Sequence, residues 1–320
     1  MNVSKIILAK PRGFCAGVAR AVKVVEDCLE IFGAPVYVKH EIVHNKTVVA
    51  DLSARGAVTV EDVRDIPEGA VVVFSAHGSP PEHYDIAGKK GATLIDATCP
   101  LVTKVHIEVH RYLKDGYKIV YIGHKGHVEG VGVLGEAKKY GVEIPLIESV
   151  SDAQSLPFSS QDKLAFLTQT TLSVSETKEI ITALREKYPQ IVSPSAQDIC
   201  YATTNRQKAV SLLAKNCDIV LVLGSVTSSN STRLAETARA QGCEAHLIDN
   251  ALAIDDEWFS DAVHTVGVTA GASAPERVVQ EVVEHFTQNG AQVEELEAVS
   301  EKMHFIEPLE LSKIKKDRGK

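Results

Sequence analysis

Short apolar runs of three to six residues alternate with longer amphipathic stretches along most of this chain of 320 residues. Such alternation is typical of α/β folds, in which parallel strands are joined by helices. Because the runs carry few polar residues, we expect strands that are buried on both faces of their sheets. The clearest expected strands are VYV (36–38), VVVF (71–74), KIVYI (118–122), KLAFL (163–167), DIVLVL (218–223) and HTVGVT (264–269).

Three cysteines divide the chain into similar parts. Each of them follows an extended stretch and begins a helical pattern; they are Cys15, Cys99 and Cys200. After the helix and a strand comes a polar turn, at 29, 28 and 29 residues from the cysteine, with His44, His127 and Ser229. A second polar turn follows 33, 43 and 44 residues later, with His77, Thr170 and Ser273. A period near one hundred residues indicates three small domains rather than a solenoid.

The repeat predicts three α/β units with mainly parallel sheets, at residues 1–98, 99–197 and 198–288, followed by a C-terminal tail. We expect the tail, 289–320, to pack back on the core and to end in a basic segment. In open parallel sheets, ligands bind beyond the carboxyl ends of the strands. Three such units would therefore bring three cysteines and six polar turns to one centre.

The six cysteines fall into two groups. Cys28 lies in a helical pattern, Cys217 before a strand and Cys243 near a turn, and a lone cysteine is usually a small buried apolar residue. The three cysteines of the repeat share a context that favours metal ligation. Three thiolates can hold three irons of a [4Fe–4S] cluster and leave the fourth iron open, or can bind zinc with a histidine as fourth ligand.

The polar turns carry imidazoles, hydroxyls and helix N-termini, which suit a phosphate or diphosphate group. Glu129, two residues after His127, is a candidate proton donor. Two other patterns carry less weight. GVGVLG (130–135) matches GxGxxG, but a polar loop separates it from the preceding strand, and HIEVH (106–110) is expected to be an exposed helix flank.

The overall charge and hydropathy exclude several classes of function. A formal net charge of −8, with no long basic block before the C-terminal end, argues against a nucleic-acid surface. No run of 18 apolar residues occurs, so we expect no membrane span. The sparse cysteines and the absence of a recognisable signal segment predict a cytoplasmic protein.

Nine segments, spread from residue 11 to residue 276, resemble the 4-hydroxy-3-methylbut-2-enyl diphosphate reductase (LytB/IspH) family. They are PRGFCAGV, EIVHNKTVV, FSAHGSP, DATCPLVTKVH, GHKGHVEG, TQTTLS, DICYATTNRQ, GSVTSSNSTRL and TAGASAPE. The resemblance implies three small α/β domains in a pseudo-threefold arrangement around a central iron–sulfur cluster. One departure is HVE at 127–129, where the family usually has HPE.

The resemblance also implies the roles of individual residues. The ligands of a [4Fe–4S] cluster fall on Cys15, Cys99 and Cys200. Substrate contacts fall on His44, His77, His127, Gln169, Thr170, Ser228, Ser229, Asn230 and Ser273. The catalytic group comprises Glu129 as proton relay, His127 in the pocket, and Thr170 on the hydroxyl side of the substrate.

The implied reaction is the reductive dehydroxylation of (E)-4-hydroxy-3-methylbut-2-enyl diphosphate to isopentenyl and dimethylallyl diphosphates, the last step of the non-mevalonate isoprenoid (MEP) pathway. An external donor such as ferredoxin or flavodoxin would supply two electrons in transient contacts. Two alternatives predict other cofactors. A nicotinamide-dependent oxidoreductase would use GVGVLG, and a zinc-stabilised phosphometabolite-binding module would use the three cysteines with a histidine.

Overall fold

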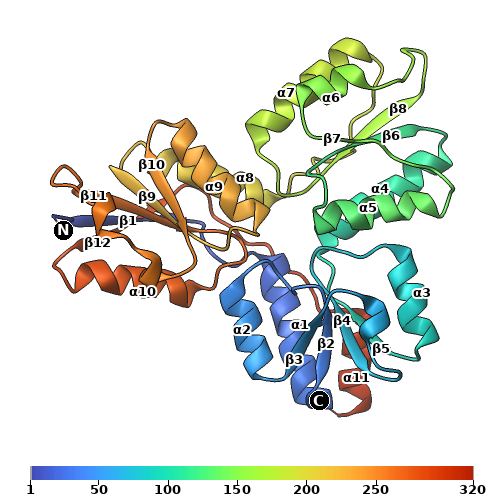
Figure 1. The fold of residues 1–320 in the computed structure, drawn as a ribbon, viewed down its shortest axis with the longest axis horizontal. Helices are drawn as coiled ribbons and strands as arrows, with labels where there is room; N and C mark the ends of the chain where they lie inside the picture. Colours follow the sequence, from blue (N-terminus) through green and yellow to red (C-terminus); the bar gives the residue numbers. More distant parts are fainter. Residues whose placement is uncertain (1, 320) are drawn as a thin grey trace. The chain divides into compact units, whose positions relative to one another are not determined.

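The structure is a computed structural model that describes residues 2–319 (Figure 1). The chain forms two compact units. Within the described residues, the first contains the segment up to Ala19, Val43–Asp51 and Tyr201–His304, and the second contains Arg20–Ile42, Leu52–Cys200 and the segment from Phe305 onward. No helix in this part of the chain is both long enough and apolar enough to cross a membrane.

The first unit is built on one sheet of five strands, all parallel, in the order β10-β9-β11-β1-β12. The strands are β1 (Lys5–Lys10), β9 (Ile219–Leu223), β10 (Glu244–Ile248), β11 (Thr265–Ala270) and β12 (Gln292–Glu297). Helices α8 (Tyr201–Leu213) and α9 (Ser229–Ala240) cover one face, and α10 (Glu276–Thr287) covers the other (Figure 1). Two short 3-10 helices, Ala251–Ala253 and Asp256–Trp258, follow β10.

The packing of strand β1 shows why the strands of this sheet are apolar at successive positions. Ile6 and Leu8 pack in the cluster that contains the apolar side chains of α10. Ile7 and Ala9 point to the opposite face and pack with α8 and α9. Since successive side chains of a strand alternate between faces, a sheet covered on both faces needs apolar residues at every position. The prediction of parallel strands buried on both faces is confirmed.

The second unit contains two smaller parallel sheets, with strand orders β3-β2-β4-β5 and β7-β6-β8. Its strands are β2 (Val36–Lys39), β3 (Ala57–Val60), β4 (Val71–Phe74), β5 (Thr93–Asp96), β6 (Lys118–Ile122), β7 (Leu146–Ile147) and β8 (Leu164–Thr168). Its helices are α3 (Pro81–Lys89), α4 (Pro100–Lys114), α5 (Val128–Lys138), α6 (Val150–Ser155), α7 (Val174–Lys187), α11 (Leu309–Asp317) and the 3-10 helix Val63–Asp65. Two of the boundaries between the units fall inside helices, one in α1 (Ala16–Phe32) and one in α2 (Lys46–Ala54).

The sheet of β6 is also covered on both faces. Helices α6 and α7 pack on the face of Val120 and Phe166, and α4 and α5 pack on the face of Ile119 and Leu167 (Figure 1). The C-terminal helix α11 contacts α1 within the second unit, where Lys315 Nζ lies 2.8 Å from Asp27 Oδ2.

The three sheets share one internal strand order. The first strand of each repeat (β2, β6 or β9) is flanked by the second (β3, β7 or β10) and by the third (β4, β8 or β11). A fourth parallel segment lies beyond the third strand; it is β5, the bridge at Val192, or β1. The N-terminal strand β1 thus completes the sheet formed by residues 219–297. Each cysteine of the repeat follows the fourth segment of one of these sheets.

The polar turns lie at the carboxyl ends of the strands. His44, His127 and Ser228 each come five residues after the end of a first strand, β2, β6 or β9. The second turns follow β4, β8 and β11 within three residues. This is the edge of an open parallel sheet where ligands bind.

Candidate functional site

The three cysteines of the repeat have equivalent backbone environments. Cys15 immediately precedes α1, Cys99 is the N-cap residue of α4, and Cys200 immediately precedes α8. All three are half-buried. Their backbone N–H groups donate to the carbonyl oxygen of a residue in or beside a second polar turn: Ala272 at 3.2 Å, Ala76 at 3.0 Å and Thr170 at 3.0 Å, respectively.

The other cysteines lie in environments that suppress the thiolate. Burial raises the pKa of Cys28 to about 12 and that of Cys217 to about 12, and it also raises the pKa of Cys243. A metal ligand must be a thiolate, so these three thiols are poor ligands. The prediction that Cys28 and Cys243 are buried apolar residues is confirmed, and Cys217 is partly buried.

In the first unit, hydrogen bonds bring together predicted substrate contacts from three turns. Ser228 is the N-cap of α9, and its Oγ lies 3.4 Å from Ser273 Oγ. The hydroxyl of Ser273 donates to the carbonyl oxygen of His44 at 2.9 Å, and Asn230 Oδ1 accepts the N–H of Ala272 at 2.8 Å. Ser229 is the first residue of α9. These side chains surround the N-terminus of a twelve-residue helix, which favours an anionic ligand.

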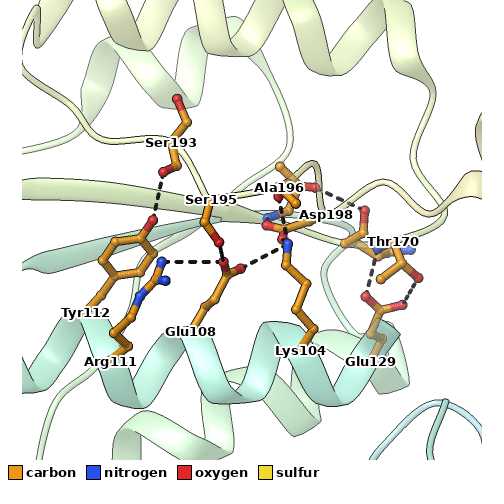
Figure 2. A network of polar contacts seen from close by, with 12 residues as sticks. Lys104, Glu108, Arg111, Tyr112, Glu129, Thr170, Ser193, Ser195, Ala196 and Asp198 are labelled. Carbon is orange, nitrogen blue, oxygen red and sulfur yellow. Dashed lines mark hydrogen bonds and ion pairs between the residues drawn. The ribbon is translucent and has the colours of Figure 1, made fainter. Parts of the chain in front are cut away.

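In the second unit, Glu129 and Thr170 form a buried pair, although they come from α5 and from the turn after β8. Glu129 Oε1 accepts the N–H of Thr170 at 2.7 Å, and Oε2 accepts its hydroxyl at 2.9 Å (Figure 2). His127 is the N-cap of α5, and its Nδ1 accepts the N–H of Glu129 at 3.2 Å. The three residues predicted as the catalytic group are therefore held together by hydrogen bonds.

Burial changes the acidity of the Glu129 carboxyl. Glu129 is 2% exposed. Burial raises the pKa of Glu129 to about 7, although the two hydrogen bonds from Thr170 lower it. A carboxyl with this pKa can hold a proton at neutral pH and release it, which is the property required of a proton donor.

His77 lies between two other histidines in the second unit. Its ring centroid is 6.4 Å from that of His127 and 5.9 Å from that of His40, both in edge-on geometry. His40, which the sequence interpretation did not single out, has Nδ1 2.7 Å from Glu61 Oε2 and a backbone φ of 62°. Its position directly after β2 was the available signal, since that is the ligand-binding edge of a parallel sheet.

Gln169 is fully buried, and its amide holds neighbouring turns together. Its Oε1 accepts the N–H of His124 at 3.0 Å, and its Nε2 donates to Thr171 Oγ1 at 2.7 Å. These contacts tie the turn after β8 to the loop that leads to His127. Its predicted contact with substrate stays a prediction.

Two further residues of α8 contact Asn230 and the residue next to Cys15, within the first unit. Thr203 is buried, and its Oγ1 lies 3.4 Å from Asn230 Nδ2. The hydroxyl of Tyr201 accepts the N–H of Ala16, next to Cys15, at 3.2 Å. Both follow Cys200 within three residues, and this proximity was their only sequence signal.

The GVGVLG segment lies within α5 and is not a strand-to-helix turn. Its glycines let this helix approach its neighbours closely. A Cβ at Gly135 would lie 2.4 Å from Pro80 Cβ, and one at Gly132 would lie 3.1 Å from the His106 ring. A dinucleotide site needs its glycines between a strand and a helix N-terminus, so this segment has a packing role.

We expect Gly135→Ala to destabilise the fold, because the added methyl group cannot be accommodated beside Pro80 without displacing α5. The predicted loss is about 1–3 kcal/mol, seen as a melting temperature several degrees lower. The matched control is Gly88→Ala in α3, where an added Cβ meets nothing within 4 Å. That variant should melt at or slightly above the wild-type temperature, and equal melting of the two variants would contradict the packing role.

The expectation that HIEVH forms an exposed helix flank is wrong for His106, which is 8% exposed. Its Nδ1 lies 2.9 Å from Glu136 Oε1, and His110 Nε2 lies 2.8 Å from Glu136 Oε2. The glycine-rich α5 covers this flank of α4 and supplies the carboxylate. A Cβ at Gly78, whose φ is 82°, would lie 2.9 Å from His106 Nε2, so His106 also supports the turn of His77.

A polar network in the second unit connects α4 to the segment before Cys200 (Figure 2). Lys104 Nζ lies 2.7 Å from Asp198 Oδ1 and 3.3 Å from Glu108 Oε2. The hydroxyl of Ser195 donates to Glu108 Oε1 at 3.0 Å. Burial raises the pKa of Asp198 above its usual value, although the Lys104 ammonium and the N–H of Thr168 oppose that rise.

Comparisons with known proteins agree on one family. The family model described as LytB protein matches residues 6–287. The chain is 54% identical over 307 residues to the 4-hydroxy-3-methylbut-2-enyl diphosphate reductase of Actinobacillus pleuropneumoniae serotype 5b (strain L20), covering 96% of this chain and 98% of that protein. It is 51% identical over 316 residues to the protein of the same name from Azoarcus sp. (strain BH72), covering 98% of this chain and 100% of that protein.

Two solved structures are also similar. The E-1-hydroxy-2-methyl-but-2-enyl-4-diphosphate reductase from Plasmodium falciparum matches with a TM-score of 0.95 at 37% identity, over 99% of this chain and 100% of the other. A structure of (E)-4-hydroxy-3-methyl-but-2-enyl diphosphate reductase, described as the terminal enzyme of the non-mevalonate pathway, matches with a TM-score of 0.65 at 31% identity. That match covers 89% of this chain and all of the other, 100%.

Proposed function

Since this chain belongs to the LytB protein family, we propose that it is an enzyme that reduces (E)-4-hydroxy-3-methylbut-2-enyl diphosphate. The reaction consumes two electrons and two protons, breaks the bond between carbon and the hydroxyl oxygen, and releases water. The products are isopentenyl and dimethylallyl diphosphates. This is the terminal step of the non-mevalonate pathway.

Cys15, Cys99 and Cys200 would hold a [4Fe–4S] cluster by three of its irons. The donor set suits this group, since these three thiols are half-buried at equivalent places, each directly before a helix. The other three thiols have a raised pKa, which disfavours the thiolate that a metal ligand must be. When bound, the cluster supplies electrons and an iron with an open position that can bind the substrate oxygen. The equivalent placement of the three cysteines is the observation that carries the proposal.

The diphosphate would be bound by hydrogen bonds rather than by a cluster of cations. In the first unit, hydroxyl, amide and imidazole groups are available at the N-terminus of α9. They belong to Ser228, Ser229, Asn230, Ser273 and His44. The N-terminal N–H groups of a helix favour negative charge. His77 and His127 would add imidazole donors from the second unit.

Glu129 would hold the proton that the reaction needs. Its pKa of about 7 keeps a substantial fraction of the carboxyl protonated at neutral pH. The Thr170 hydroxyl, 2.9 Å from Glu129 Oε2, would orient the hydroxyl side of the substrate and connect it to this carboxyl. The burial of both residues excludes bulk water from the proton path.

The electrons would come from a small redox protein, such as ferredoxin or flavodoxin, in a transient contact. No other partner is required for the chemistry. The cytoplasmic location predicted from the sequence stays a prediction.

The test is anaerobic purification followed by iron and acid-labile sulfide analysis and a turnover assay with a chemical reductant. We expect about four irons and four sulfides per chain, and conversion of the hydroxylated diphosphate into both products. Tightly bound zinc without iron would instead support a binding module. A colourless protein that binds NADH would support a nicotinamide enzyme, and either result would refute the proposal.

A further inference from the structure

Each of the three helices that follow the cysteines of the repeat carries a basic residue a little more than one turn from its start. We call these three the clamp residues; they are Arg20 in α1, Lys104 in α4 and Arg206 in α8. They lie five, five and six residues after the cysteine that precedes their helix. None of them has been assigned a part in the reaction above.

Arg20 holds the segment that leads into Cys99. Its Nη1 donates to the carbonyl oxygens of Ala97 and Thr98, at 3.2 and 3.1 Å. Both carbonyl groups belong to residues that are at least nine-tenths buried. The segment is irregular backbone after the end of β5, so no strand pairing fixes these two carbonyl groups.

Lys104 holds the segment that leads into Cys200 (Figure 2). Its Nζ donates to the carbonyl oxygen of Ala196 and to Asp198 Oδ1, both at 2.7 Å. The other carboxylate oxygen of Asp198 accepts the N–H of Thr168 at 2.9 Å. One ammonium group therefore fixes this segment through both its backbone and a buried side chain.

Arg206 holds the segment that leads into Cys15. It is fully buried, and its Nη2 and Nε donate to the carbonyl oxygen of Gly13 at 2.8 and 3.2 Å. Gly13 has a φ of 65°, and its N–H donates to the carbonyl oxygen of Ala270 at the end of β11. The Arg206 charge is balanced by Glu301, with Nη1 at 3.1 Å from Oε1.

These contacts form a directed cycle along the chain. The helix begun by Cys15 holds the approach to Cys99, the helix begun by Cys99 holds the approach to Cys200, and the helix begun by Cys200 holds the approach to Cys15. Each of the three contacts lies within one compact unit. Each cysteine is linked to the clamp residue that follows it by the first residues of the helix between them. A basic side chain at nearly the same spacing contacts the segment before a cysteine in every repeat.

We propose that the clamp residues are positioning residues that fix the three cysteines in the conformation that binds the cluster. The proposal rests on the proposed function, because it concerns the same metal centre. Groups that orient metal ligands without touching the metal commonly change metal affinity when they are replaced. Each clamp residue acts on the cysteine of the next repeat. Replacing one clamp residue should therefore affect one identified cysteine.

The experiment compares Lys104→Met and Arg20→Met with wild type, with Lys104→Arg as the conservative variant. Lys118→Met is the matched control, because Lys118 forms an ion pair of the same length, 2.7 Å, with Asp162, and neither residue belongs to a segment that leads into a cysteine. Hydrogen exchange is measured on the metal-free chains. The rate of iron loss to a chelator is measured on anaerobically reconstituted chains, at a temperature where all variants are folded by circular dichroism.

In Lys104→Met, we expect faster exchange of the Cys200 N–H, which is bonded to Thr170, and unchanged exchange of the Cys99 N–H. In Arg20→Met, the pattern should reverse. Both variants should lose iron about tenfold faster than wild type or more, and the electron paramagnetic resonance spectrum of the reduced cluster should change. Lys104→Arg should recover part of the loss, and Lys118→Met should match wild type.

Wild-type exchange and iron loss in both Met variants would overturn the proposal, and so would exchange that increases equally in all segments, which indicates general destabilisation. Wild-type chain that takes up no iron or sulfide would refute the proposed function instead. In that case the exchange measurements still test whether the clamp residues fix the cysteine segments, because these measurements use metal-free protein.

Discussion

Replacement of Cys200 by serine is expected to abolish assembly of an intact cluster and to lower turnover at least about a hundredfold. Serine preserves the size of the side chain and the N–H that donates to Thr170. Its hydroxyl ionises far less readily than a thiol, so it cannot supply the soft anionic ligand that iron requires. Iron and acid-labile sulfide per chain, together with turnover under a chemical reductant, measure the effect.

Cys243→Ala is the control for this experiment. Cys243 is 7% exposed, and burial raises the pKa of its thiol, so its loss should leave iron content and turnover at wild-type levels. Equal losses of iron in Cys200→Ser and Cys243→Ala would remove the distinction between the two groups of cysteines. Full iron content with normal turnover in Cys200→Ser would exclude it as a ligand.

Glu129→Gln is expected to keep the cluster and the affinity for substrate but to lose turnover by a factor of about 10² to 10⁴, the usual contribution of a positioned acid. The glutamine oxygen can still accept the N–H of Thr170, while the side chain can no longer release a proton. Steady-state kinetics should therefore show a lower kcat with little change in KM. Glu179→Gln, an exposed residue of α7, is the control, and normal turnover in Glu129→Gln would refute the proton role.

Glu129→Gln should raise the stability of the fold although it lowers turnover, and the gain in stability should depend on pH. The pKa of Glu129 is about 7 in the folded chain against an ordinary value of 4.5, so the folded state binds the extra proton between these two values. The free energy of unfolding of the wild type therefore falls as pH rises through this window, by about 3 kcal/mol from this group. Glutamine does not ionise, so the melting temperature of Glu129→Gln should exceed that of the wild type more at pH 8 than at pH 5. A difference that does not change with pH would show that the carboxyl titrates alike in both states.

Much of this architecture could be predicted from the sequence, because the relevant signals are local. Strands β6 and β9 are short apolar runs, and the helices after the cysteines have clear amphipathic patterns. The edge strand β10, EAHLI, carries a charged residue and a histidine, and β7 has two residues, so neither stands out by composition. The pairing of β1 with β11 joins residues about 260 positions apart, which no local pattern encodes.

The candidate site likewise contains residues that could be predicted from the sequence and residues that could not. The spacing of the cysteines and polar turns identified residues such as Glu129 and Thr170, and the structure places these two in hydrogen-bond contact. The role of the glycines in α5 could not be predicted, because it depends on Pro80 and His106, which come from other elements. His40 was missed for a related reason, since its neighbour His77 lies on a different strand end.

The place of β1 in the sheet of residues 219–297 has a consequence for synthesis on the ribosome. At about 5 to 20 residues per second, the first strand emerges on the order of tens of seconds before β11, beside which it pairs. During that time its apolar residues lack their partner strands β11 and β12, so this strand is exposed to non-native pairing until the end of synthesis.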